Sequence, residues 1–399
     1  MTAGNPYFQK KVAKKEVVFY FFLLLFSLCV FASSISEPLK YLKYGLPVLL
    51  AVVLLASSKK INFRKSDFKY NPRYRYLIGL SSFYFLVCSV NLVKGFSNPR
   101  FYQEFYFVLS PLLFALLLFY LRPAKNYLRA VYLLFWGITA AFIAEKFPFF
   151  LDELRHPSIL VDAFLTSELP TESNYAFEFG LFAIVFLERR NKTYSLLSLL
   201  FLLLSFKRIA IAAVFIYVVL ALFRKLFGQS FNPANRKGLI FLTNCLVVGV
   251  LFLFFSGTFD EMIENTFGVS SNFLTQGRYN IYQDIFHHFG HIDFLGFGLG
   301  AINTFLSNTG YELVNLHSDV LKVFFELGPV AFVFWIYFFY KWSNSFLSTC
   351  LAIYINVLFL TDNVFIYFDV MFVFYITMIY GLENADAFVQ KDVEQSPAL

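Results

Sequence analysis

The chain has 399 residues, of which 58% are hydrophobic, 21% aromatic and only 15% charged. Soluble domains carry about 25% charged residues, so this composition, with a mean hydropathy of +0.63, excludes the soluble classes. The net charge of +7 does not indicate nucleic-acid binding, because the basic residues cluster in short segments between long apolar runs. We therefore expect an all-α, polytopic integral membrane protein.

About twelve apolar runs approach the length of roughly 20 residues that a helix needs to cross hydrocarbon. They lie near 17–35, 41–57, 76–93, 105–121, 128–144, 174–187, 193–206, 209–223, 239–255, 319–340, 345–360 and 364–381. No small-residue cleavage site follows the first run, so we expect no cleavable signal peptide. The chain is predicted to form one membrane domain over 1–399.

The distribution of Lys and Arg predicts the orientation. Most of the 33 basic residues fall at the N-terminus and in the loops that share its side, which places both termini, including a tail over 382–399, in the cytoplasm. Segments 145–173 and 256–318 then face outward, and 256–318 is the large periplasmic loop. Within it we expect an amphipathic helix near 278–290 that lies flat on the membrane surface, followed by a glycine-rich turn.

Four cysteines lie inside apolar runs, and their spacing fits neither a metal site nor a redox motif. They are Cys29, Cys88, Cys245 and Cys350. We expect no disulfide bonds.

Carboxylates mark the outer start of the sixth run, in "ELPTESNYAFEFG". Glu172 precedes Asn174, which is a candidate polar residue of an outward cavity or simply caps the helix. Glu178 lies one to two turns inside the run, where a carboxylate is a functional candidate by default. Asp369, in "FIYFDVMFVF", is a similar candidate with weaker support.

Cations stand at two outward positions. Lys207 and Arg208 occupy the turn in "LLLSFKRIAIAA", and Arg278 stands in "TQGRYN". A guanidinium group binds a diphosphate well because its planar fork makes paired hydrogen bonds. The alternative is that these side chains extend to lipid headgroups, an interpretation that fits Lys207 best.

The histidines of "HHFGH" are candidates for metal binding, since His287 and His291 are four residues apart and can share a helical face. No cysteine or carboxylate completes a convincing set, although Asp284 and Asp293 are near. We interpret the motif as part of an interfacial helix and predict neither metal nor cofactor.

Polar residues also gather before the tenth run, in "HSDVLKVFFELG". His317 can act as a base at neutral pH, and Gly328, three turns later, would admit a neighbouring helix closely. Asp319, Lys322 and Glu326 either line a wet outer cavity or form an ordinary helix start with a Lys322–Glu326 pair. Both interpretations stay open.

These motifs together resemble the bacterial O-antigen polymerase and O-antigen ligase superfamily. "HS" at 317–318 stands nine residues before Gly328, and "QGRYNIYQDIF" and "FLGFGLG" precede it. "SFKRIAI" resembles the arginine-bearing turn, with Lys207 where a small residue is more usual, and "PTESNYAFEFG" resembles an outward helix start. The resemblance covers about 165–335.

The resemblance implies a glycosyltransferase of the bacterial inner membrane. Its donor and acceptor would be oligosaccharides linked to polyprenyl diphosphate, and its partners would include membrane lipids and a chain-length regulator protein but no nucleic acid. Arg208 and Arg278, with Lys207, would bind the diphosphate, and His317 would lie at the reacting centre, with Glu172 or Glu178 as the alternative base. "LPTES" favours a polymerase; a ligase, a secondary transporter and a non-catalytic scaffold remain alternatives.

Overall fold

The computed structural model describes residues 6–57, 71–93, 99–121, 127–155, 172–275, 277–290, 293–311 and 316–394. Nearly all of them are helical. The first half contains α1 (Pro6–Ile35), η1 (Glu37–Tyr41), α2 (Leu42–Ser57), α4 (Pro72–Val93), α5 (Pro99–Leu121), α6 (Tyr127–Arg155), α8 (Tyr175–Glu188), α9 (Lys192–Leu204) and α10 (Arg208–Phe227). The second half contains η2 (Gly228–Phe231), η3 (Pro233–Asn235), α11 (Lys237–Phe255), α12 (Asp260–Phe267), α13 (Ser271–Leu274), α14 (Arg278–Phe289), α15 (Ala301–Asn308), α16 (Asp319–Lys322), η4 (Val323–Leu327), α17 (Pro329–Lys341), α18 (Phe346–Phe359), η5 (Val364–Ile366) and α19 (Phe368–Glu394).

The predicted fold class is confirmed: the protein is an all-α, multi-pass membrane protein. Among the described residues, seven helices are long and apolar enough to cross a membrane, namely α1 together with the helices α2, α4, α5, α6, α10 and α11. The other expected runs coincide with shorter helices. α8, with 14 residues, spans only about 21 Å at 1.5 Å per residue, and it is almost entirely buried among its neighbours.

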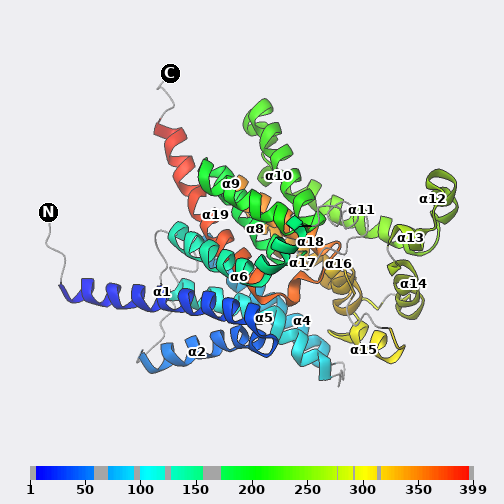
Figure 1. Cartoon of the computed structure of the whole chain (residues 1–399), viewed down its shortest axis with the longest axis horizontal. Coiled ribbons are helices and arrows are strands. Elements are labelled where there is room, and N and C mark those ends of the chain that lie inside the picture. The colour runs from blue at the N-terminus through cyan, green and yellow to red at the C-terminus, as the bar shows by residue number, and fades with distance from the viewer. Residues whose placement is uncertain are drawn as a thin grey trace.

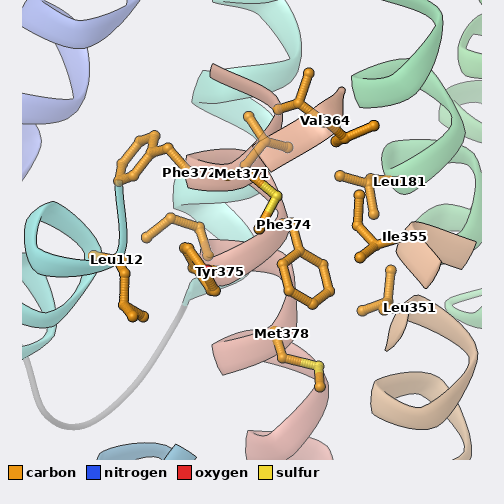
Figure 2. Packing of buried hydrophobic residues seen from close by; sticks show 14 of the residues in the cluster. Leu112, Leu181, Leu351, Ile355, Val364, Met371, Phe372, Phe374, Tyr375 and Met378 are labelled. Carbon is orange, nitrogen blue, oxygen red and sulfur yellow. The ribbon is translucent and has the colours of Figure 1, made fainter. Parts of the chain in front are cut away.

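The core surrounds α19, which packs against α5, α8, α18 and α6. Figure 2 shows Phe374 and Met378 of α19 beside Leu351 and Ile355 of α18. All four side chains are buried. Because water is absent from a bilayer, such a bundle depends on close packing rather than on the hydrophobic effect between helices.

The outer helices leave apolar side chains uncovered, as a lipid-facing surface requires. On α11, the exposed residues Leu239, Leu242, Leu246, Val250 and Leu253 recur every three or four positions. This spacing forms one continuous stripe along the helix. The stripe therefore marks the face that contacts lipid.

Helices α12 to α15 gather at one end of the molecule, away from both termini (Figure 1). The expected helix near 278–290 is present as α14, and its position on the membrane surface stays a prediction. Its apolar face, including Tyr282, Ile285 and Phe289, packs in a separate core with Phe255 and Phe325. The protein itself covers this face, so little of it is available to lipid.

The run expected as one helix over 319–340 is interrupted. α16 passes into the π-helical turn η4, which ends at Gly328, and α17 begins at Pro329. Proline disfavours a helical conformation in the preceding residue, and Gly328 has φ +91°. A Cβ atom at Gly328 would lie 2.5 Å from Gly296 N. The close neighbour of Gly328 is thus the glycine-rich turn and not, as predicted, another helix.

Candidate functional site

The turn between α9 and α10 brings Lys207 to one end of the bundle. Phe206 adopts a left-handed conformation, with φ +47°, which reverses the chain within three residues. The backbone N–H of Ser173 donates to the carbonyl of Ser205 over 3.2 Å and fixes the start of α8 on this turn. Lys207 Nζ consequently lies 3.0 Å from Glu172 Oε1 and 3.4 Å from Asp362 Oδ2. Lys207 therefore does not extend freely to lipid headgroups.

Asp362 connects this turn to the predicted histidine. Its Oδ1 accepts hydrogen bonds from the backbone N–H of Asn363 at 2.8 Å and from the Tyr367 hydroxyl at 3.2 Å. His317 Nδ1 lies 3.9 Å from the same oxygen, a distance too long for a direct hydrogen bond. Burial raises the pKa of Asp362, but the imidazole, the Lys207 ammonium and the Asn363 N–H together lower it below its ordinary value of 3.8. Asp362 is thus a carboxylate at neutral pH.

His317 is held by the residues that follow it. Ser318 caps α16 by accepting from the backbone N–H of Leu321 at 3.4 Å, and the Asp319 carboxylate accepts from the backbone N–H of Phe365 at 2.8 Å. The second contact fixes the start of α16 to the segment that follows Asp362. The imidazole keeps 26% of its side-chain surface exposed, so it remains accessible to a substrate.

A polar cavity of about 430 Å³ opens beside Lys207. The end of α6, the start of α8 and the start of α19 form its walls. Its charged lining residues are Glu145, Lys146, Glu172, Glu178, Lys207 and Asp369. Glu172, Glu178 and Asn174, which were predicted as site residues, therefore come together with Lys207 around one space.

Most charges in the cavity wall have a partner within the wall or just behind it. Asp369 Oδ2 lies 2.8 Å from Lys43 Nζ, and Glu145 Oε1 lies 3.2 Å from Lys146 Nζ. The Tyr175 hydroxyl donates to Glu145 Oε2 over 3.1 Å. Glu178 differs: it is 1% exposed, and its Oε2 has no hydrogen-bond partner among the described residues.

The two predicted arginines occupy separate helix starts. Arg208 is the first residue of α10 and is exposed, whereas Arg278 is the first residue of α14 and is half-buried. Within the described part of the chain, neither forms an ion pair with a carboxylate. The charges of Arg278 and Asp362 both act on the hydroxyl of Tyr282. Burial raises the pKa of that hydroxyl, Arg278 lowers it and Asp362 raises it further.

Asp319, Lys322 and Glu326 do not line the polar cavity. Lys322 Nζ lies 2.8 Å from Glu104 Oε2 of α5 rather than pairing with Glu326. Glu326 Oε1 instead accepts from the backbone N–H of Ile302 at 3.1 Å. All three predicted residues are buried, and Lys322 contributes only to a small apolar pocket with Glu104. Their partners in neighbouring elements, which no local sequence pattern reveals, place them in the interior.

The histidine-rich motif lies on α14, away from these carboxylates. His287 is exposed, and the ring of His288 stacks on Phe305 with centroids 4.3 Å apart. His291 lies outside the described residues. No group of three or more metal-ligating side chains occurs in the part of the chain that the structure describes.

Asp362 is the principal site residue that sequence reasoning missed, along with Glu145, Lys146 and Tyr367. The available signal was a carboxylate in "TDNVF" at the boundary of two apolar runs, on the predicted outer side. An ionisable residue at such a position is a functional candidate. Only the fold, however, reveals that it faces both Lys207 and His317.

The O-antigen ligase family model matches residues 193–336, from α9 into α17. Comparison with curated proteins and with solved structures found no match. The family match confirms the resemblance to the O-antigen polymerase and ligase superfamily. Lys207, Arg208, Arg278 and His317 lie inside the matched segment, whereas the cavity walls from α6, α8 and α19 lie outside it.

Proposed function

We propose that this protein is a membrane glycosyltransferase that polymerises oligosaccharide repeat units linked to polyprenyl diphosphate. The observation that supports this most directly is the contact of Lys207 with Asp362, which links the polar cavity to His317. The coarser assignment, to surface-polysaccharide synthesis of the O-antigen polymerase or ligase type, follows from the family match.

In the proposed reaction, His317 removes a proton from an acceptor sugar hydroxyl, because the nitrogen facing away from Asp362 is free to accept it. The hydroxyl oxygen forms a bond to the anomeric carbon of the donor sugar. The bond from that carbon to the diphosphate breaks, and polyprenyl diphosphate leaves with the electron pair. Glu172 is the weaker candidate base, since Lys207 already pairs with it at 3.0 Å.

Arg208 and Arg278 would bind the leaving diphosphate. Both are free of carboxylate partners among the described residues, and each can make paired hydrogen bonds to phosphate oxygens. Lys207 is less suited to this role than predicted, because Glu172 and Asp362 already balance its charge. With guanidinium groups stabilising the leaving group, we expect a metal-independent reaction that a chelator leaves unchanged.

The proposed setting is the bacterial inner membrane, with both termini cytoplasmic and the cavity at the periplasmic face. The lipid-linked donor and acceptor would enter from the bilayer, and a chain-length regulator protein would act as a partner. The clustering of α12 to α15 at the end opposite the termini (Figure 1) fits this arrangement.

Two other functions have an observation in their favour. The matching family model describes an O-antigen ligase, which would transfer the polysaccharide to lipid A core. The interrupted helix at Val323–Gly328 would suit a secondary transporter. In this protein, however, the glycine-rich turn fills the interruption, with Gly298 N donating to Glu326 O over 2.7 Å.

Reconstitution in proteoliposomes with purified lipid-diphosphate-linked repeat units separates these functions. We expect ladders of added units, and no ladders with the H317A variant. Transfer only to added lipid A core would identify a ligase, and movement of substrate across the bilayer without new bonds would identify a transporter. Either result would contradict the polymerase proposal.

A further inference from the structure

Among the ionisable residues of the described cavity wall, only Glu178 has a buried carboxyl oxygen without a hydrogen-bond partner. The wall otherwise pairs Lys207 with Glu172, Lys146 with Glu145, and Asp369 with Lys43 behind it. Glu178 lines the same space and is 1% exposed. Its Oε2 accepts no hydrogen bond from the described residues.

A buried carboxylate oxygen without a donor is costly, and native proteins satisfy nearly all such groups. A ligand in the cavity would supply the missing donor. Sugar hydroxyl groups are suitable donors, and the wall adds the side chains of Asn174 and Tyr175, which also form hydrogen bonds. The volume of about 430 Å³ lies within the range of small-molecule sites.

The charges of the described wall restrict which ligand fits. Four acidic side chains face two ammonium groups in the wall. Behind the wall, Asp362 adds a fifth acidic group and Lys43, which pairs with Asp369, adds a third ammonium group, so acidic groups remain in excess. A diphosphate or a carboxylated sugar would meet electrostatic repulsion here. The donor diphosphate therefore belongs at the arginines, which leaves this cavity for the non-reducing end of the acceptor, where the sugar presents hydroxyl groups and the acceptor's own diphosphate is distant.

We propose that the cavity binds the acceptor sugar, and that Glu178 accepts a hydrogen bond from a hydroxyl group of an uncharged, non-uronic sugar at the acceptor's non-reducing end. This inference rests on the proposed polymerase function and adds its acceptor specificity. Lys207 belongs to the cavity wall and contacts Asp362, which faces His317. An acceptor bound in the cavity would therefore lie next to the part of the site that contains His317.

The test uses the full-length protein in proteoliposomes and a repeat unit on a short alkyl chain without diphosphate, which can serve only as acceptor. We expect E178Q to raise the KM for this acceptor about ten-fold or more, the effect of leaving a buried polar group without its hydrogen bond, with an unchanged KM for the lipid-diphosphate donor. N174A is a second variant with a lower risk of misfolding, because Asn174 is exposed, and should act in the same direction. E264Q, an equal charge change at an exposed position of α12, is the control.

Acceptor KM values of both variants within two-fold of the wild type would overturn the inference. So would a methyl hexuronide that inhibits as strongly as neutral methyl hexosides, or a uronic acid at the non-reducing end of the natural repeat unit.

A calorimetric titration of the protein in nanodiscs with the lipid-free repeat-unit oligosaccharide separates this inference from the proposed function. If the wild type forms no glycosidic bond but binds this oligosaccharide, and E178Q weakens that binding, the polymerase function fails while the sugar site stands. If the wild type is active but E178Q binds the oligosaccharide normally, only the sugar site fails.

Discussion

Lys207 and Asp362 lie 3.4 Å apart, Nζ to Oδ2, although α10, α11 and the whole segment from α12 to α18 separate them in the chain. The contact joins the α9–α10 turn to the loop that follows α18. Asp362 Oδ1 also lies 3.9 Å from His317 Nδ1. The Asp362 carboxylate therefore lies between the Lys207 ammonium group and the His317 imidazole. The chemistry proposed above depends on this relation.

Replacing either arginine should abolish polymer formation. In R208A and R278A, the leaving diphosphate loses the guanidinium group that stabilises its charge, which we expect to lower kcat by about 10²-fold or more. R278K should retain partial activity, because an ammonium group keeps the charge but not the paired hydrogen bonds. Gel analysis of the polysaccharide and rates in proteoliposomes provide the measurement. K225A, at the far end of α10, is the control, and normal long-chain product in both arginine variants would contradict the diphosphate role.

Removing the imidazole should affect the rate more than binding. We expect H317A to lower kcat by about 10²–10⁴-fold, the range typical of a lost general base. D362N should cause a smaller loss, because the imidazole remains but loses the charge that orients it. H287A, an exposed histidine on α14, should behave as wild type. Near-normal activity of H317A would show that this histidine is structural.

The lowered pKa of Asp362 predicts how the stability of the fold depends on pH. Its pKa in the folded protein lies below the ordinary value of 3.8, so its ionised form stabilises the fold above about pH 4 and this contribution disappears as the pH falls through the lowered pKa. The melting temperature of wild type should therefore exceed that of D362N by a constant amount between pH 5 and 7, and the difference should shrink below about pH 4. A difference that grows in acid would contradict the assigned direction.

The buried Lys322–Glu104 pair should be essential for folding rather than for chemistry. K322M leaves Glu104 with only its contact to Arg100, at 3.0 Å, and we expect it to cost about 3–5 kcal/mol. The double variant E104L/K322M should recover part of this loss, because Glu104 no longer remains as a buried charge without Lys322. Thermal unfolding in detergent measures both. The exposed Lys40–Glu37 pair is the control: E37Q should leave the melting temperature essentially unchanged, because exposed ion pairs contribute little to stability.

Two glycines with similar backbone angles should tolerate alanine very differently. Gly328 has φ +91° and would place a Cβ atom 2.5 Å from both Gly296 N and Phe294 O, whereas Gly310 has φ +77° and open space around it. G310A should cost only the backbone strain, about 1–2 kcal/mol. G328A must also displace the glycine-rich turn, so we expect little folded protein in the membrane. Equal expression and melting temperatures for the two variants would contradict this.

Hydropathy predicted most of the fold, because the need to satisfy every backbone group in lipid leaves few alternatives to helices. Hydropathy did not predict which helix surfaces other parts of the protein cover, or where a tertiary contact interrupts a helix. The sequence pattern of α14 did not indicate that Phe255 and Phe325 cover its apolar face. At the interruption, Gly328 packs against Gly296. The pattern of apolar residues along one run cannot predict this contact, because Gly296 lies outside that run.

The site was predictable in its residue types but not in its pairings. Glu172, Glu178 and Lys207 were identified from their position at the outer ends of apolar runs, and they share one cavity. Asp319, Lys322 and Glu326 satisfied the same criterion, yet their partners are Phe365 N, Glu104 and Ile302 N in the interior. Only tertiary contacts distinguish a carboxylate facing a cavity from one that binds a neighbouring backbone.

The origin of the cavity walls has an evolutionary consequence. The cations and the imidazole lie within 193–336, the segment that matches the family, whereas Glu145, Glu178 and Asp369 project from α6, α8 and α19 outside it. Substitutions of these three cavity-lining side chains therefore leave the family-matched segment unchanged, within the limits that the buried packing of α8 and α19 sets. If the cavity binds the acceptor sugar as proposed, such substitutions would let a bacterium alter its surface coat while the proposed reaction stays the same.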